Sequence, residues 1–244
     1  MENPDYQNLI SAGRDNGASS RTALEKELDL ERVNSCLAGL TPQERIGWAK
    51  DRFGSGLVLS TSFGIYSAVM LHLVNQACPD VPVIFIDTGY LTPQTYRFKK
   101  RLVESFGLDV RTYIPRRTRA EREALDGSIP ENPAGWNGLE QVAREVKVEP
   151  LERALAELGA AAWMSGVMKG ETTERKEFRF IMRRKDGIYK FHPILDWDSR
   201  QSHRYITANG LPLNAEYADI FKPESKECGI HRTGMDLSLT SSEL

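Results

Sequence analysis

Short apolar runs alternate with helix-spaced stretches along the middle of the chain. Residues 57–59 form one apolar run, and from Ile65 onward the apolar positions follow helical spacing. The same patterns repeat where the run at 81–86 is followed by a helix that begins with Thr92 and Pro93. Apolar runs this short are typical of parallel strands that are buried on both faces. The alternation predicts an α/β fold: an open, mostly parallel twisted sheet with helices on both faces.

Further elements continue the alternation towards residue 210. Strands are expected over 108–114 and 160–164, whereas residues 115–136 have no regular pattern. Asp186 and Gly187 separate two strand-like runs, which predicts a hairpin with a type I′ turn. Helices are expected within 23–40 and over 41–54, 139–146, 150–159 and 199–209, the last of them capped by Ser199.

These elements divide the chain into three parts. Residues 1–40 are expected to form an N-terminal extension, mobile at first and then helical. The α/β domain is expected to span 41–210, and its first helix begins with a capping box made by Thr41 and Glu44. Residues 211–244 are then a C-terminal tail.

Composition argues against several classes of protein. With 244 residues, of which 40% are hydrophobic, the chain is long enough to bury a substantial core. Its formal net charge of −2 argues against nonspecific nucleic-acid binding, which needs a basic surface. No apolar run reaches membrane-spanning length, and residues 1–5 are unlike the basic start of a signal peptide. We therefore expect a cytoplasmic protein with neither a nucleic-acid nor a membrane partner.

The cysteines are few and widely separated. Cys36, Cys78 and Cys228 form neither a Cys-x-x-Cys pair nor a disulfide framework. They also cannot supply the four thiolates of an all-cysteine iron–sulfur cluster. Cys36 and Cys78 are expected to pack as small apolar residues.

The turn after the first apolar run carries candidate chemistry. An open α/β sheet binds ligands beyond the carboxyl ends of its strands, where a helix N-terminus also attracts anions. Ser60, Ser62 and Ser67 place hydroxyl groups there, and Gly64 lets the backbone approach a bound group closely. The same residues are compatible with an ordinary strand-to-helix turn in which Ser62 is the N-cap.

The end of the run at 81–86 repeats this arrangement. Asp87 adds a carboxylate, Thr88 a hydroxyl and Gly89 a permissive backbone position. Two such strand ends side by side would form a crevice of nucleotide size. Asp87 is also compatible with the role of an ordinary turn residue. Residues 169–177 are rich in charge, glycine and threonine, and are expected to form a mobile loop over the crevice.

A group of arginines follows the third expected strand. It is more typical of a solvated surface than of a phosphate site, and the latter is the minority interpretation. Its members are Arg116, Arg117, Arg119 and Arg122.

Cys228 differs from the other cysteines because it lies in a polar stretch near the C-terminus. Gly229 follows it and His231 lies three residues on. Lys226 and a protonated His231 would lower the pKa of the Cys228 thiol, whereas Glu227 would raise it. A single exposed thiol of this kind would need an external thiol carrier to regenerate it. An incidental tail cysteine is the alternative.

Five short motifs, taken together, match one known family. They are Leu-Ser-Thr-Ser-Phe-Gly at 59–64, Asp-Thr-Gly-Tyr at 87–90, Lys-Val-Glu-Pro-Leu at 147–151, Pro-Ile-Leu-Asp-Trp at 193–197 and Glu-Cys-Gly-Ile-His at 227–231. In these motifs the chain resembles the phosphoadenosine phosphosulfate (PAPS) reductase family. The resemblance covers roughly residues 40–231 and implies an adenine nucleotide α-hydrolase-like fold.

The resemblance also implies a reaction and a set of site residues. Family members attack the sulfonate sulfur of PAPS with the C-terminal cysteine, which gives an S-sulfocysteine and adenosine 3′,5′-bisphosphate. Reduced thioredoxin or glutaredoxin then releases sulfite, in assimilatory sulfate reduction. The residues matched are Cys228 as nucleophile, His231 near the phosphosulfate, Lys147 facing the sulfate, Ser60, Ser62, Phe63 and Gly64 in the nucleotide loop, Asp87, Thr88 and Gly89 in the second wall, and Gly166 and Arg175 in the next loop.

The substrate expected from the resemblance depends on two features of the sequence: the cysteines that it lacks and the positions at which it departs from the family. Related reductases of adenosine phosphosulfate (APS) hold an iron–sulfur cluster through cysteine pairs that this chain lacks, so the cluster-free, PAPS-using branch is the better match. The chain also departs from the family, because Met168 and Lys169 replace a double arginine and the arginine-free segment 211–226 is short. These departures keep APS or another less charged nucleotide as an alternative substrate.

Two other functions stay open. An ATP-pyrophosphatase-like adenylating enzyme is disfavoured, because the turn at 60–64 lacks the acidic residue that such enzymes use for Mg²⁺. A non-catalytic nucleotide-binding paralogue would not need Cys228. A homodimer is what the resemblance implies for the assembly.

Overall fold

The structure, a computed structural model, describes residues 28–131, 133, 136–172 and 174–221. Two site residues expected from the sequence, Cys228 and His231, lie outside the described residues, as does most of the expected extension 1–40. Among the described residues, no helix combines the length and hydropathy needed to cross a membrane.

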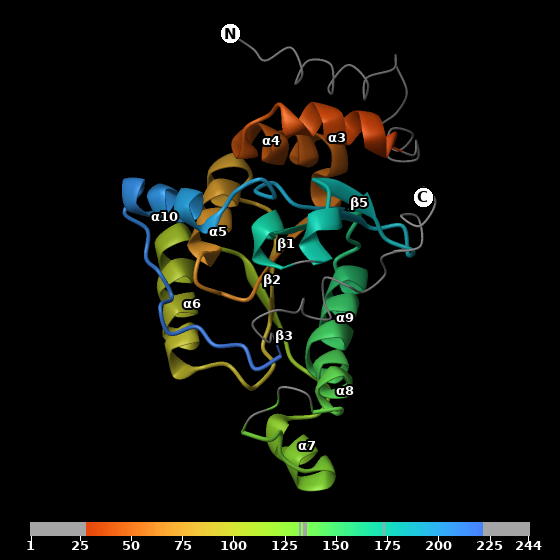
Figure 1. Cartoon of the computed structure of the whole chain (residues 1–244), viewed down its shortest axis with the longest axis vertical. Coiled ribbons are helices and arrows are strands. Elements are labelled where there is room, and N and C mark those ends of the chain that lie inside the picture. Colours follow the sequence, from red (N-terminus) through yellow and green to blue (C-terminus); the bar gives the residue numbers. More distant parts are fainter. Residues whose placement is uncertain (1–27, 132, 134–135, 173, 222–244) are drawn as a thin grey trace.

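One six-stranded sheet forms the core of the described chain (Figure 1). Its strand order is β3-β2-β1-β4-β6-β5, and all neighbouring strands are parallel except β5 and β6. The predicted open, mostly parallel sheet is therefore confirmed. The strands are β1 (Leu57–Thr61), β2 (Val83–Ile86), β3 (Val110–Tyr113), β4 (Ala162–Ser165), β5 (Ile181–Arg183) and β6 (Tyr189–Phe191).

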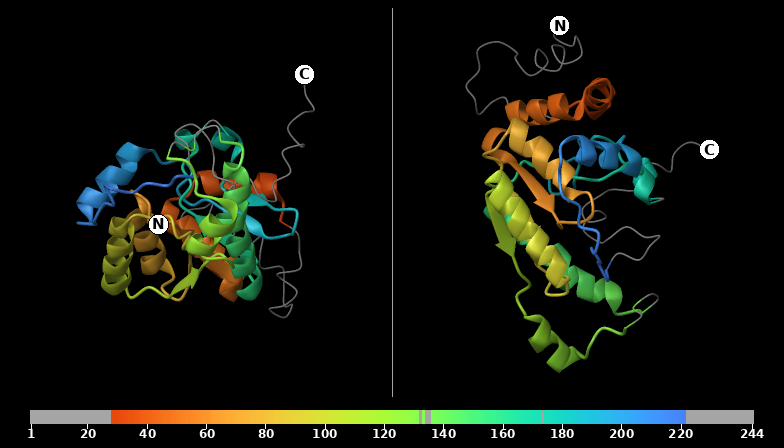
Figure 2. Two further views of the ribbon diagram at one scale, coloured as in Figure 1. Left: turned by 90° about the horizontal axis from the view of Figure 1, so that it is seen from below. Right: turned by 90° about the vertical axis from the view of Figure 1, so that its left-hand side faces the viewer.

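Helices pack on both faces of this sheet (Figures 1 and 2). Leu57 and Leu59 of β1 join a buried cluster with residues of α4, α5, α6 and α10, whereas Val58 packs on the other face with Leu151 and Leu155 of α9. The helices are α3 (Leu30–Ala38), α4 (Pro42–Phe53), α5 (Ser67–Ala77), α6 (Pro93–Phe106), α7 (Arg119–Asp126), α8 (Leu139–Ala143), α9 (Glu149–Glu157) and α10 (Ser199–Ala208), with short 3₁₀ turns at Gly54–Gly56, Lys169–Glu171 and Glu174–Glu177.

Several helix ends follow the signals read from the sequence. Thr41 and Glu44 form the predicted capping box at the start of α4. Thr92 caps α6, and Gly107 ends it in the left-handed conformation, with φ 64°. Cys78 follows α5 and is buried, which raises the pKa of its thiol to about 11. Cys78 is therefore a packing residue and not a reactive thiol.

Two local predictions were wrong in detail. α10 is capped by Asp198, whose side chain accepts from the backbone N–H of Gln201, and not by Ser199. The hairpin of β5 and β6 is confirmed, but its turn is not type I′, because only Gly187 within it has a positive φ. The Gly187 N–H donates to the Arg184 carbonyl, as expected when a left-handed glycine follows an ordinary turn.

The predicted break near Lys147 is absent from the described helices. α8 continues through a π-helical turn, Arg144–Val148, directly into α9. Pro150 lies at the start of α9, immediately after the π-turn, and the helical run continues past it. Lys147 therefore projects from a π-turn, a feature often found at functional sites.

A helix also forms in the segment for which the sequence predicted no regular structure. α7 is capped by Thr118 and lies at one end of the molecule (Figure 1). Arg122 is buried there and donates to the Tyr90 hydroxyl, while Arg116 and Arg117 pair with Glu149 and Glu145. The side chains of Arg116 and Arg119 are more than half exposed, as the solvated-surface interpretation expected, whereas the burial of Arg122 contradicts that interpretation.

Candidate active site

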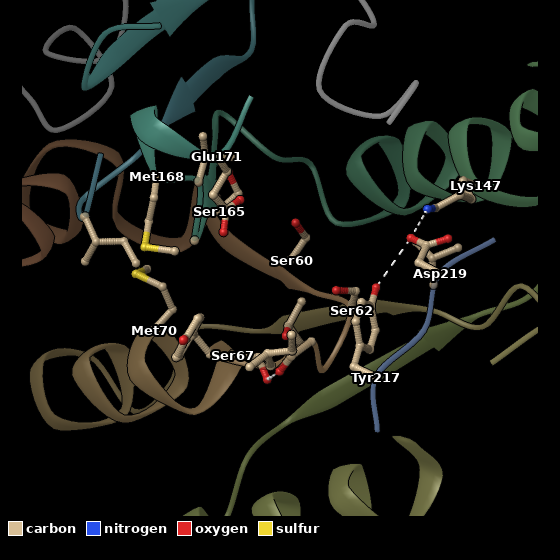
Figure 3. A pocket seen from close by; sticks show the side chains of 18 of the residues that line it. Ser60, Ser62, Ser67, Met70, Lys147, Ser165, Met168, Glu171, Tyr217 and Asp219 are labelled. Atoms are coloured by element: carbon tan, nitrogen blue, oxygen red, sulfur yellow. Dashed lines mark hydrogen bonds and ion pairs between the residues drawn. The ribbon is translucent and has the colours of Figure 1, made fainter. Parts of the chain in front are cut away.

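A pocket lies at the carboxyl ends of β1, β2 and β4 (Figure 3), with a cavity of about 280 Å³. This is the edge at which α/β sheets of this kind bind ligands. Seven of the site residues predicted from the sequence line it: Ser60, Ser62, Gly64, Thr88, Lys147, Gly166 and Arg175. Ser67, whose hydroxyl the sequence also placed at this turn, lines the cavity as well. The lining residues that sequence reasoning did not single out as site residues are Thr61, Ile65, Tyr66, Met70, Ile86, Leu91, Leu151, Ser165, Val167, Met168, Glu171, Ile194, Tyr217 and Asp219.

Phe63 shapes the turn between β1 and α5 without lining the cavity. Its side chain is fully buried and packs edge to face against Phe85, with ring centroids 5.2 Å apart. Its φ of 51° is left-handed, and Asn214 Nδ2 donates to its carbonyl oxygen at 2.8 Å. The segment that leads towards the C-terminus thus helps to hold this turn in its conformation.

The turn between β1 and α5 is longer than a strand-to-helix turn in which Ser62 would be the N-cap. α5 begins at Ser67 after Tyr66, and no side-chain hydrogen bond caps it. The alternative role of Ser62 as N-cap is therefore wrong. The Ser67 hydroxyl donates to the Gly64 carbonyl at 2.8 Å, which closes the turn around the cavity.

Asp87 and Gly89 lie next to the pocket but do not line it. Asp87 Oδ1 accepts from the Gly89 N–H at 3.0 Å and from the Tyr96 hydroxyl at 2.6 Å. Burial, and then this carboxylate, raise the pKa of Tyr96. Asp87 thus makes the contacts of a turn residue in this state, and its part in binding a nucleotide stays a prediction.

Lys147 meets a carboxylate from the C-terminal segment at one side of the pocket (Figure 3). Its Nζ lies 2.5 Å from Asp219 Oδ2, and both side chains are less than a tenth exposed. The Tyr217 hydroxyl lies 3.4 Å from the same oxygen, and the Phe221 N–H donates to Asp219 Oδ1. No sequence pattern marks Tyr217 or Asp219 as site residues. Lys147, the partner of Asp219, lies 72 residues earlier in the chain.

Arg175 meets a carboxylate within its own loop. It is buried and forms an ion pair with Glu171, four residues earlier, whose side chain is one-third exposed. Glu171 is labelled in Figure 3 on the side of the pocket opposite Asp219. The described part of the pocket lining therefore contains two cations, Lys147 and Arg175, and each is matched by an internal carboxylate.

Comparisons with known proteins agree on one family. The family model described as "Phosphoadenosine phosphosulfate reductase domain" matches residues 56–222, which is more than half of the chain. The chain belongs to this family.

Curated PAPS reductase relatives support the assignment over most of their length. The phosphoadenosine 5′-phosphosulfate reductase of Synechococcus sp. is 46% identical over 187 residues, covering 76% of this chain and 79% of that protein. The one from Shigella dysenteriae is 35% identical over 239 residues, covering 88% and 97%. The expectation that the chain is an enzyme of the PAPS reductase class is confirmed at the level of the family.

Solved structures confirm the fold of the PAPS reductase family. The PAPS reductase of Candida auris, in a phosphate complex, superimposes with a TM-score of 0.65 at 29% identity, covering 82% of this chain and 92% of that one. The FMN adenylyltransferase of Candida glabrata has a TM-score of 0.55 at 12% identity, covering 98% and 83%, which is a likeness of fold alone.

Met168, at which the sequence departs from the expected PAPS reductase pattern, lies in the wall of the pocket. The Met168 side chain is buried and accepts a hydrogen bond at its sulfur from the Ser202 hydroxyl of α10, at 3.2 Å. It also lines the pocket, so an apolar surface stands where the family pattern has an arginine. Among the described residues, no group of three or more His, Cys, Asp or Glu side chains could hold a metal ion.

Proposed function

We propose that this protein reduces PAPS to sulfite and adenosine 3′,5′-bisphosphate in assimilatory sulfate reduction, with a dithiol protein as the electron donor. One observation carries the proposal. The pocket at the strand ends gathers motif residues that are far apart in the chain, including Ser62, Lys147 and Arg175, and a family model for PAPS reductases spans all of them. Hydroxyls and cations around one cavity suit a phosphosulfate anion.

The proposed reaction has two steps. The Cys228 thiolate attacks the sulfonate sulfur, the bond from that sulfur to the phosphate oxygen breaks, and adenosine 3′,5′-bisphosphate leaves. A thiolate of reduced thioredoxin or glutaredoxin then attacks Cys228 Sγ, and sulfite leaves with the electron pair of the S–S bond. The second thiol of the donor resolves the mixed disulfide and regenerates Cys228, so that the donor dithiol supplies both electrons.

Lys147 and Arg175 would meet the negative charge of the substrate and of the leaving group. Each cation is now matched by a carboxylate, so a bound anion would compete with Asp219 for Lys147 and with Glu171 for Arg175. His231 near the phosphosulfate, the absence of an iron–sulfur cluster, a homodimer and a cytoplasmic location are parts of the proposal that rest on the sequence.

Sulfite release from PAPS in the presence of reduced thioredoxin tests the proposal. We expect turnover by the wild-type protein and none by Cys228→Ser, while Cys36→Ser serves as a matched control that keeps its activity. A parallel assay with APS measures substrate choice. Sulfite release that persists in Cys228→Ser would contradict the mechanism, and a lack of release from both nucleotides would contradict the function.

A further inference from the structure

Two serine hydroxyls lie side by side on the floor of the pocket. Ser60 and Ser165 are register partners at the carboxyl ends of β1 and β4, and both line the cavity (Figure 3). Ser60 belongs to a motif predicted from the sequence, whereas Ser165 does not. A buried aromatic ring from the protein interior contacts each hydroxyl.

The hydrogen bond to Ser60 has a fixed direction. Trp163 Nε1 lies 2.6 Å from Ser60 Oγ, and an indole nitrogen can only donate. Ser60 Oγ therefore accepts from Trp163, and its own O–H is available to donate elsewhere. A hydroxyl held in this way is an anion-binding donor at the end of a strand.

Ser165 has the same arrangement, with His192 in the place of the indole. His192 Nδ1 lies 3.0 Å from Ser165 Oγ, and the ring is fully buried and stacked on Phe178 at 5.5 Å. Burial first, and then the charges of Lys190 and Arg175, hold the pKa of His192 well below its usual value. The ring is therefore neutral and carries one hydrogen, on one of its two nitrogens.

One observation places that hydrogen on Nδ1. Among the described residues, Nε2 is buried without a hydrogen-bond partner, and a buried N–H with no acceptor is rare in proteins. With the hydrogen on Nδ1, Ser165 Oγ accepts from His192.

We propose that Ser165 is an anion-binding residue of this pocket and that His192 is its positioning residue. The ring donates from Nδ1 to Ser165 Oγ, so the Ser165 hydroxyl donates into the cavity, to a phosphate or sulfate oxygen of the bound nucleotide. The pair Ser60 and Ser165 then recognises the anion with two parallel hydroxyl donors. This inference rests on the proposed function, because it takes the phosphosulfate nucleotide as the ligand.

Calorimetric binding of nucleotides to the full-length protein tests the role of Ser165. We expect Ser165→Ala to weaken binding of AMP about tenfold or more, the value of one hydrogen bond to a charged group, and to leave adenosine binding unchanged. If the partner is a sulfate oxygen, AMP binding stays unchanged and PAPS binding weakens when Ser165→Ala is added to Cys228→Ser. Unchanged binding of both anions would overturn the inference.

A double-mutant cycle tests the role of His192. His192→Leu removes the donor and should weaken anion binding as much as Ser165→Ala, whereas His192→Asn keeps an N–H near the Nδ1 position and should restore most of it. The double variant Ser165→Ala/His192→Leu should be no weaker than Ser165→Ala alone. Additive losses would mean that His192 acts only through packing and would overturn its positioning role.

A measurement on the wild-type protein does not depend on the folding of any variant. Nitrogen-15 chemical shifts of the His192 ring should show the hydrogen on Nδ1, and a hydrogen on Nε2 would overturn the inference. Failure of the proposed function is distinguishable, because it would appear as a wild-type protein that releases no sulfite. Sulfite release with unchanged anion binding by Ser165→Ala would overturn only the role of Ser165.

Discussion

The two cations of the pocket are neutralised in different ways. Lys147 projects from a π-turn and pairs with Asp219, which lies 72 residues away in the C-terminal segment. Arg175 pairs with Glu171 in its own loop, only four residues away. The first pair is almost fully buried, whereas the carboxylate of the second is one-third exposed. The first pair thus couples the pocket to the segment that leads to Cys228, and the second is a local and better solvated contact.

Removal of Lys147 is expected to have the largest effect. Lys147→Ala leaves the buried Asp219 carboxylate without its cation and takes a positive charge from the anion site. We expect kcat/KM for PAPS to fall about 100-fold or more, because the substrate anion loses a charge-assisted hydrogen bond in a mostly buried site. Steady-state kinetics and thermal unfolding check this, with Lys100→Ala on the surface as control. Near wild-type kcat/KM in Lys147→Ala would contradict the assignment of the anion site.

Removal of the charge on Asp219 should strengthen ligand binding, whereas removal of Lys147 impairs the reaction with PAPS. Asp219→Asn abolishes the competition between Asp219 and the ligand for Lys147, so binding of adenosine 3′,5′-bisphosphate should tighten on the order of tenfold. The melting temperature of the ligand-free protein should fall, because the buried pair is lost. Glu216→Gln, an exposed carboxylate of the same segment, is the matched control and should change neither quantity. Weaker binding by Asp219→Asn would mean that Asp219 assists the ligand.

His192 extends the comparison, because it is a buried basic group whose lowered pKa keeps it neutral, and no carboxylate of the described residues pairs with it. Its pKa in the folded protein is below the 6.5 of an unperturbed histidine, so the unfolded chain binds more protons at acidic pH. The contribution of neutral His192 to the free energy of unfolding is fully present above pH 6.5. It is lost as the pH falls, by up to about 1.4 kcal/mol per pH unit.

Melting temperatures between pH 7.5 and 5.0 check this prediction. The wild-type protein should lose more stability on acidification than His192→Asn, which has no group to protonate at this position. Equal losses in the two proteins would show that His192 is not held neutral.

Disruption of the pair between Arg175 and Glu171 should have the smallest effect on ligand binding. Glu171→Gln removes a carboxylate that solvent already screens, so binding of adenosine 3′,5′-bisphosphate should tighten only about two- to threefold. Titration calorimetry measures this, with the exposed Glu177→Gln of the same loop as control. If Glu171→Gln increased the ligand affinity more than Asp219→Asn, the prediction that the buried pair competes more strongly with the ligand would be wrong.

The sheet could be predicted because its signals are local. The apolar run at 57–59 and the caps at Thr41 and Thr92 each depend on a few neighbouring residues, and the structure contains the corresponding strand and helices. α7 and the π-turn at Lys147 could not be predicted in this way. Arg122 is buried against Tyr90, 32 residues away, and this stabilises α7 in a polar segment.

The contents of the pocket were predictable only in part, for the same reason. Ser60, Ser62 and Lys147 belong to recognisable motifs and do line the cavity. Asp219 and Ser165 carry no local signal, since their roles depend on partners that the fold brings to them. Asp87 is the opposite case. It belongs to a recognisable motif, but it contacts Tyr96 and Gly89 beside the pocket and does not line the cavity.

The mass of the intact, reduced protein after incubation with PAPS, without any thiol donor, tests the central claim most directly. We predict a gain of about 80 Da, the mass of one SO₃ group transferred to a nucleophile. The gain should be absent in Cys228→Ser and reversed by reduced thioredoxin with release of sulfite. An unchanged mass under conditions in which adenosine 3′,5′-bisphosphate binds would contradict the claim and would identify the chain as a nucleotide-binding paralogue.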